Sequence, residues 1–285
     1  VVMGLINNAH GGSQLGVLNA IVHSIQAIGK NKAVNRDLLQ SYCAPETMLT
    51  KDNHRGKFKM ELDFWISVGL INDKSNKVSL NFDLDGPKSI WREARRALLR
   101  KKNWETSNDL HEPLCFFYGA NLTFMDIEKI TEAIKNNSDI TFNSNVKPYF
   151  EQHAHTFGYS TKLGNKFIAD PTSIIIEEIH TSNELKVDTE IKISDFISLI
   201  SNTNPLLDGG EIRTQVEKKY GLESLFKAGM VSFSLSLALQ RMVRSGMIEL
   251  RMQSDTTDYL TFDSRVSNAN ISHEYSHLKL KRLAQ

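Results

Sequence analysis

Residues Ser232–Phe262 read SFSLSLALQRMVRSGMIELRMQSDTTDYLTF, and this stretch decides how the fold of the whole chain is interpreted. Leu235, Leu239 and Met242 are spaced as on one face of a helix, and Gly246 follows where a helix is expected to end. The rest of the stretch predicts two short strands joined by a polar turn. A helix followed by such a hairpin is the second half of a winged helix-turn-helix domain.

A second stretch with the same order lies near the other end of the chain. Two predicted helices, over residues 15–28 and after Asn35, precede a third helix over residues 53–68. A hairpin is predicted over residues 70–82. Three helices and a hairpin in this order predict a second winged helix-turn-helix domain.

The segment between these two stretches is predicted to be mostly helical, for instance over residues 124–134 and 146–157. The expected fold class is therefore mainly α (α+β), with two winged helix-turn-helix domains flanking a helical middle domain. The expected parts are an N-terminal winged-helix domain (1–86), a helical middle domain (87–189), a C-terminal winged-helix domain (190–265) and a tail (266–285).

The composition limits what the chain can bind. It has 285 residues with 34 Lys and Arg against 33 Asp and Glu, so its net charge is +1 and any nucleic-acid surface must be local. No apolar run approaches the roughly 18 residues of a membrane span, and the beginning lacks the pattern of a secretory signal. Two cysteines are typical of reduced thiols. We expect a cytoplasmic protein with no membrane contact and no cofactor.

Basic residues on the predicted helices and hairpins are the candidate DNA contacts, because cations on the third helix and the wing of such a domain meet phosphates. Surface lysines are also ordinary, and an arginine stripe is often an exposed helix face paired to acids. The candidates are Arg55, Lys57, Lys59 and Lys77 in the first domain, Arg92, Arg96 and Arg100 on a helix of the middle domain, and Arg241 and Arg244 in the opening stretch.

One short motif has the form of a zinc site. His273-Glu274-Tyr275-Ser276-His277 matches H-E-x-x-H, in which two histidines on one helical face share a zinc ion and the glutamate acts as base. The residues that follow alternate in a strand-like way, and none of them is a good third ligand. We therefore predict no metal and no catalytic residue, with His273 and His277 as weak metal candidates only.

Four groups of residues resemble the DpdG family, proteins encoded in bacterial clusters that insert and act on 7-deazaguanine-type bases in DNA. The resemblance implies a cytoplasmic component of the restriction arm that acts with helicase and nuclease partners. Its motifs cover most of the chain and include no catalytic set. They are Ala44-Pro45-Glu46, Phe157-Gly158-Tyr159 ahead of Ile168–Thr172, Asn204–Gly210, and Ser232–Arg241.

Three functions follow as hypotheses. The first is a non-enzymatic, DNA-engaging subunit of a bacterial DNA-restriction or anti-phage defence complex, which contacts the DNA backbone and partner proteins. The alternative is a tandem winged-helix scaffold that docks an SMC-type or other ATPase without reading DNA. The third is a zinc-dependent hydrolase that uses the HEYSH motif.

Overall fold

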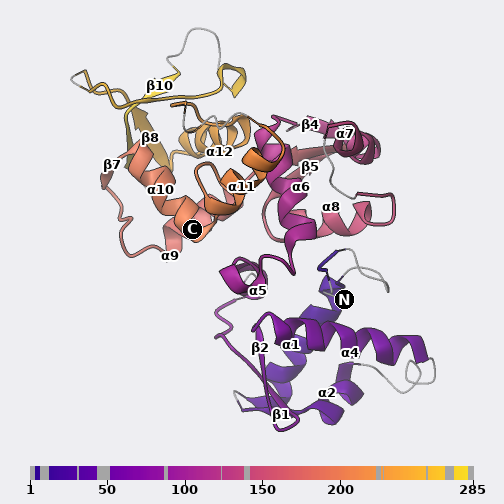
Figure 1. Cartoon of the computed structure of the whole chain (residues 1–285). Helices are drawn as coiled ribbons and strands as arrows, with labels where there is room; N and C mark the ends of the chain where they lie inside the picture. The colour runs from indigo at the N-terminus through magenta and orange to yellow at the C-terminus, as the bar shows by residue number, and fades with distance from the viewer. Residues whose placement is uncertain are drawn as a thin grey trace. The chain divides into compact units, whose positions relative to one another are not determined.

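A computed structural model of the chain contains helices and small antiparallel sheets (Figure 1). Its contacts divide it into two compact units, Val1–Asp109 and Leu110–Gln285, which we describe separately. The structure describes residues 4–6, 13–30, 32–43, 52–86, 89–122, 124–137, 142–222, 226, 228–254, 256–266 and 273–281, without the side chains of residues 52–55, 127 and 137.

The first unit begins with three helices and a small sheet in the order expected from the sequence. The sheet is antiparallel, with strand order β1-β3-β2. A further helix and a short 3-10 helix follow it. The elements are α1 (Leu15–Gly29), β1 (Val34–Asn35), α2 (Arg36–Cys43), α4 (Asp52–Ser67), β2 (Ile71–Lys74), β3 (Lys77–Leu80), α5 (Ser89–Leu98) and η1 (Lys101–Asn103).

The predicted buried stripe of the third helix is confirmed. Phe58, Leu62 and Trp65 are at most 5% exposed, so one face of α4 packs into the core of the first unit. The hairpin that follows turns through Ser75 and Asn76, whose φ angles of 54° and 62° match the type I′ turn that suits a two-residue hairpin.

The first part of the second unit repeats this order. Its sheet has the strand order β4-β6-β5. The elements are α6 (Asn108–Gly119), β4 (Phe124–Asp126), η2 (Ile127–Lys129), α7 (Ile130–Asn137), α8 (Lys147–Thr156), β5 (Ser160–Leu163) and β6 (Lys166–Ala169).

The prediction of a helix over residues 124–134 was wrong at its start. Residues Phe124–Asp126 form a strand because they pair with β6, whose Phe167 and Ile168 are buried. The backbone partner of this segment lies about forty residues further along the chain, and helical spacing within the segment does not reveal it.

The second part of the second unit contains the same order once more, with insertions. Its main sheet has the strand order β7-β11-β8, and a separate pair joins β10 to β9. The elements are α9 (Thr172–Thr181), β7 (Glu190–Lys192), α10 (Ile193–Thr203), α11 (Glu211–Lys219), α12 (Phe233–Arg244), β8 (Ile248–Arg251), β9 (Leu260–Thr261), η3 (Ser264–Val266), β10 (Glu274–Tyr275) and β11 (His277–Leu280).

Three segments of the chain thus share one topology. In the described residues of each segment, a helix precedes a short strand, two further helices and two further strands. The last strand lies between the other two in the sheet. The third segment adds α11 between its helices, and β9, η3 and β10 between its last two strands. The sequence indicated the first and third copies, and the structure adds the middle one.

The hairpin predicted inside the opening stretch was wrong. Strand β8 does not pair with β9; it pairs with β11, in the register Ile248↔Leu280 to Arg251↔His277. Leu278 and Leu280 are 1% and 2% exposed, so burial of these two side chains favours this pairing. The segment expected to be a tail therefore supplies the central strand of the third sheet.

Helix α5 belongs to the first compact unit, and residues 110–285 form the second. Within the part of the chain that the structure describes, no helix combines the length and apolarity needed to cross a membrane.

Candidate nucleic-acid interface

Helix α4, the third helix of the first copy, turns two lysines outward. Lys57 and Lys59 are exposed, whereas Phe58 between them is buried. The buried stripe on the other side of α4 fixes this orientation, because helical geometry places residues between the stripe positions on the outer faces. The side chain of Arg55 lies outside the described residues.

A polar depression of about 330 Å³ adjoins this helix. Side chains of α2, α4 and the hairpin turn line it: Arg36, Asp37, Gln40, Phe58, Lys59, Leu62 and Asn76. Its walls therefore come from the second helix, the third helix and the wing-like hairpin of one copy.

Arg36 joins these three elements. Its Nη2 pairs with Asp63 of α4, and its Nη1 donates to Asp73 Oδ2 of β2 at 2.9 Å. Burial by itself would lower the pKa of Arg36, but the two carboxylates outweigh that effect and raise it. One guanidinium offsets only one of these two carboxylate charges, and Asp37 also lines the depression, so the positive charge of this surface comes from the lysines nearby.

The hairpin adds a facing pair of lysines. Lys74 and Lys77 are opposite each other in the β2–β3 register, directly flanking the turn, and both are exposed. Like charges directly opposite destabilise a sheet. Among the described residues neither lysine has a carboxylate partner, so an anion bound here would relieve the repulsion.

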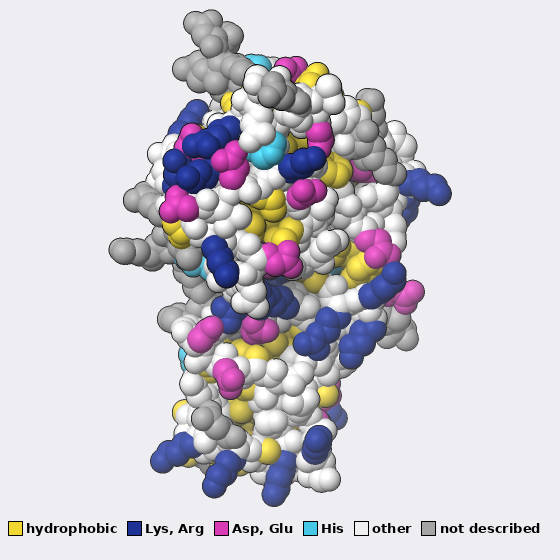
Figure 2. All heavy atoms as spheres, turned by 90° about the vertical axis from the view of Figure 1, so that its left-hand side faces the viewer, with side chains coloured by type: hydrophobic (Ala, Val, Ile, Leu, Met, Phe, Trp, Pro, Cys, Tyr) yellow, Lys and Arg dark blue, Asp and Glu magenta, His cyan; other side chains and the backbone are white. Residues whose placement is uncertain are grey.

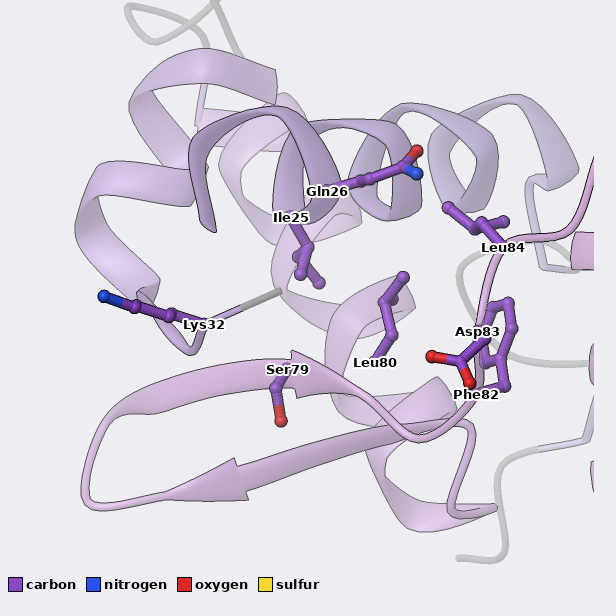
Figure 3. Close-up of a pocket in the computed structure, with 8 residues that line it drawn as sticks. All are labelled: Ile25, Gln26, Lys32, Ser79, Leu80, Phe82, Asp83 and Leu84. Carbon is purple, nitrogen blue, oxygen red and sulfur yellow. The ribbon is translucent and has the colours of Figure 1, made fainter. Parts of the chain in front are cut away.

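Lys30 and Lys32, which the sequence analysis missed, belong to the same end of the unit. Both are exposed in the connection between α1 and β1. Figure 3 shows Lys32 extending toward the turn end of the hairpin, beside a cavity of about 100 Å³ that Ile25 and Leu80 help to line. Figure 2 shows several dark-blue side chains along the lower end of the molecule, where β1 lies in Figure 1. Only the pairing of β1 with β3 brings these lysines to the hairpin.

The arginine stripe of α5 is largely occupied by protein partners. Arg92 donates to Asp85 and Glu93, at 2.9 Å in each case, and Arg96 donates to Glu93 at 3.3 Å. Arg100 donates to the carbonyl oxygen of Gly69 at 3.4 Å, where α4 ends. The alternative interpretation of this stripe, a helix face paired to acids, is thus confirmed for Arg92 and Arg96, and Arg100 caps a helix.

Helix α12 of the opening stretch has little free surface. Leu235, Leu239 and Met242 are buried as predicted, but Ser234, Ser236 and Ala238 are buried as well. These small side chains allow close packing on a second face of the helix. The outward side chains of α12 lie near its C-terminal end, where Gln240, Arg241 and Val243 are partly exposed and Arg244 is exposed.

Arg241 and Arg244 each have a hydrogen-bond partner within the second unit, although Arg241 is partly exposed and Arg244 is exposed. Arg241 Nη1 pairs with Asp170 Oδ2, whose side chain is 7% exposed, and Arg244 Nη2 donates to the carbonyl oxygen of Val266 at 3.4 Å. In this structure both guanidinium groups therefore have protein partners.

The start of α12 is also fixed by buried polar contacts. Asp208 accepts hydrogen bonds from the backbone N and the Oγ of Ser232, at 2.7 and 2.8 Å. The Oγ of Ser232 in turn accepts from the backbone N of Leu235 at 3.4 Å. The Asn204–Gly210 segment thus stabilises the N-terminus of this helix.

Three of the HEYSH residues lie on strands, Glu274 and Tyr275 on β10 and His277 on β11. His273 precedes β10, His277 begins β11, and His277 Nδ1 is 3.0 Å from Ser276 Oγ. The helix that would place both imidazoles on one face of a zinc site is not formed there. Within the described residues, no three His, Cys, Asp or Glu side chains gather in a way that could hold a metal ion.

The fold and the cationic end of the first unit define a chain of repeated helix-and-sheet domains with one lysine-rich surface. A family profile, DpdG-like, matches residues 3–256, and the chain belongs to that family. The family expected from the sequence is thereby confirmed, and it points to a DNA-modification system. No curated protein and no solved structure matches the chain.

Proposed function

We propose that the chain is a non-enzymatic subunit of a DNA-restriction or anti-phage defence complex, and that its first unit binds the backbone of duplex DNA. In this proposal each of the three copies is a winged helix-turn-helix domain. The family supports a role in a DNA-modification system. A helicase or nuclease as partner and the cytoplasm as location are further parts of the proposal.

One observation carries the proposal. Lys57 and Lys59 on α4, and Lys74 and Lys77 on the hairpin, are exposed and, among the described residues, have no carboxylate partner. Lys59 lines the depression together with Arg36 and Asp37, and Arg36 pairs with Asp63 and Asp73 of the neighbouring elements. Lysines act as point charges for phosphate, so this surface suits binding that does not depend on base sequence.

The contrast between the first and third copies supports the same assignment. Helix α4 keeps an open, lysine-bearing face, whereas the corresponding helix α12 is packed on two faces and its arginines have protein partners. We therefore assign DNA contact to the first copy and a packing role to α12.

A salt series tests the proposal. Duplex binding is measured by fluorescence anisotropy for the unmodified chain, for Lys57→Gln with Lys59→Gln, and for Lys74→Gln with Lys77→Gln. Each lost phosphate contact should reduce the slope of log K against log salt by about 0.9. Lys135→Gln, an exposed lysine of α7, is the matched control and should leave the slope unchanged. Binding by the unmodified chain that neither double variant weakens would refute the assignment.

A second candidate function is a scaffold that docks an SMC-type or other ATPase. Leu38 and Tyr42 of α2 support it, since they lie one helical turn apart and are 44% and 64% exposed. In this case Leu38→Ser with Tyr42→Ser would abolish co-purification with the partner ATPase and leave duplex binding unaffected. Loss of neither interaction would remove α2 as a docking face.

A further inference from the structure

The hairpin of the middle copy projects an apolar side chain. Leu163 is directly opposite Lys166 at the end of the β5–β6 ladder, and Gly164-Asn165 form the turn. Gly164 has a φ of 59°, as expected for the first central residue of a type II′ turn. Among the described residues, no heavy atom outside the neighbouring chain positions lies within 4 Å of the position that a Cβ would take at Gly164, so this point of the turn faces open space.

The first and middle copies carry different side chains at equivalent places. The pair that flanks the turn is Lys74↔Lys77 in the first copy and Leu163↔Lys166 in the middle copy. Leu163 is 68% exposed, more than any other large apolar side chain of the described residues. At that exposure it contributes little to the core, and a partner that covered it would be stabilised by its burial.

The base of this hairpin is firmly held. Phe167 of β6 is buried, with its ring centroid 5.4 Å from that of Phe117 and 5.5 Å from that of Phe150. Lys162 Nζ donates to Glu151 Oε2 of α8 at 3.0 Å. The tip is therefore presented by a rigid base, which limits the entropy lost when the tip binds.

The ammonium group of Lys166, the residue opposite Leu163, makes a weak ion pair. Lys166 Nζ is 3.8 Å from Asp126 Oδ1, and the two side chains are 49% and 33% exposed. Exposed pairs of this kind stabilise a protein only slightly, so the ammonium can exchange the carboxylate for a phosphate at little cost.

We propose that the β5–β6 tip is a second duplex contact, in which Leu163 enters the minor groove as an apolar wedge and Lys166 meets the adjacent phosphate. Apolar side chains of this size part neighbouring base pairs when they enter that groove, and flanking cations hold the strand beside them. The inference rests on the proposed function, because it needs a chain that binds duplex DNA.

The test combines affinity with base stacking. The duplex contains 2-aminopurine, whose fluorescence rises when neighbouring bases unstack, and binding is followed over the same salt series. Leu163→Ala should weaken binding about tenfold, as expected for loss of a buried leucine side chain, and should abolish the fluorescence rise. The slope against log salt should not change, since no phosphate contact is lost.

Two further variants make the result specific. Leu163→Met keeps an apolar tip and should retain the fluorescence rise. Val187→Ala truncates another exposed apolar side chain of the second unit, 44% exposed, and should bind like the unmodified chain.

The outcomes separate the two proposals. If the lysine variants of the first copy weaken binding but Leu163→Ala does not, the wedge is refuted and the proposed function stands; the tip would then be free to dock a protein. Weaker binding without any change in 2-aminopurine fluorescence would also refute insertion. No duplex binding by the unmodified chain would overturn both proposals.

Discussion

Glu61 is the side chain of the first unit whose replacement has the clearest expected result. It is 5% exposed and accepts three hydrogen bonds. Its Oε1 accepts from Ser13 Oγ at 2.5 Å and from Trp65 Nε1 at 2.6 Å, and its Oε2 accepts from the backbone N of Gln14 at 2.8 Å. This carboxylate therefore connects α4 to the start of α1.

The substitution Glu61→Gln changes this arrangement with almost no change in shape. The amide oxygen can keep the bonds from Ser13 and Trp65, but the amide nitrogen then faces the N–H of Gln14, donor against donor. The backbone N–H of Gln14 is then left without its acceptor. The hydrogen bonds from Ser13 and Trp65 now go to a neutral amide oxygen instead of a charged carboxylate. We expect the free energy of unfolding to fall by about 1–3 kcal/mol at pH 7.

The effect should depend on pH. Burial raises the pKa of Glu61 above its ordinary value of 4.5, and the hydrogen bonds from its three donors only partly offset this. The folded state then binds a proton more readily than the unfolded state. The stabilisation that comes from this tighter proton binding is fully present below the pKa of Glu61 in the unfolded state. It is lost as the pH rises through the pKa of Glu61 in the folded state. Glutamine takes up no proton, so the cost of Glu61→Gln should increase as pH falls from 7 toward 4.5.

Tryptophan fluorescence measures the effect in the correct unit. All three tryptophans of the chain, Trp65, Trp91 and Trp104, lie in the first unit, so their emission during urea unfolding reports on that unit. The native emission of Glu61→Gln should also shift, because the indole of Trp65 donates directly to the replaced group. Glu105→Gln, at an exposed carboxylate of the same unit, is the matched control and should change neither quantity.

A variant with unchanged unfolding free energy and unchanged Trp65 emission would show that the three hydrogen bonds do not stabilise the fold. A cost that decreased toward pH 4.5 would show that the sign of the pKa shift is wrong.

Two further predictions concern the second unit. Asp208→Asn should lower its stability by about 1–3 kcal/mol in urea unfolding followed by far-ultraviolet circular dichroism, because one of the two buried donors of Ser232 loses its acceptor. The control Asp258→Asn removes only an exposed partner of Lys192 and should cost less than about 1 kcal/mol; equal effects would contradict the reasoning. Cys115 is fully buried and burial raises its pKa to about 12, so a thiol reagent at pH 8 should modify it only after unfolding. Peptide mass mapping checks this, and rapid labelling of the native protein would show that the site opens.

Several features of the fold follow from local sequence. The stripe of Phe58, Leu62 and Trp65 predicted α4 and its buried face, since one-sided burial leaves a period of three to four residues. Asn35 caps α2, with its Oδ1 accepting from the backbone N of Asp37 at 2.8 Å. Gly69 has the positive φ, 78°, that ends a helix. Each of these signals acts over a few residues, so a single sequence is enough to find it.

The candidate site was predictable only in part. The exposed lysines Lys57, Lys59 and Lys77 were found because they stand beside a readable helix stripe and hairpin. Lys30 and Lys32 were missed, because only the pairing of β1 with β3 brings them to the hairpin.

The sequence by itself determined where most helices run, the first copy of the repeated topology and the family of the chain. The tertiary structure alone decided that β8 pairs with β11, that the middle copy has a sheet, and that Arg241 is bound to Asp170. The physical reason is the range of the interactions. Helix periodicity and turn preference act between near neighbours, whereas a strand's partner, the second buried face of a helix and the partner of a charge come from residues far away in the chain.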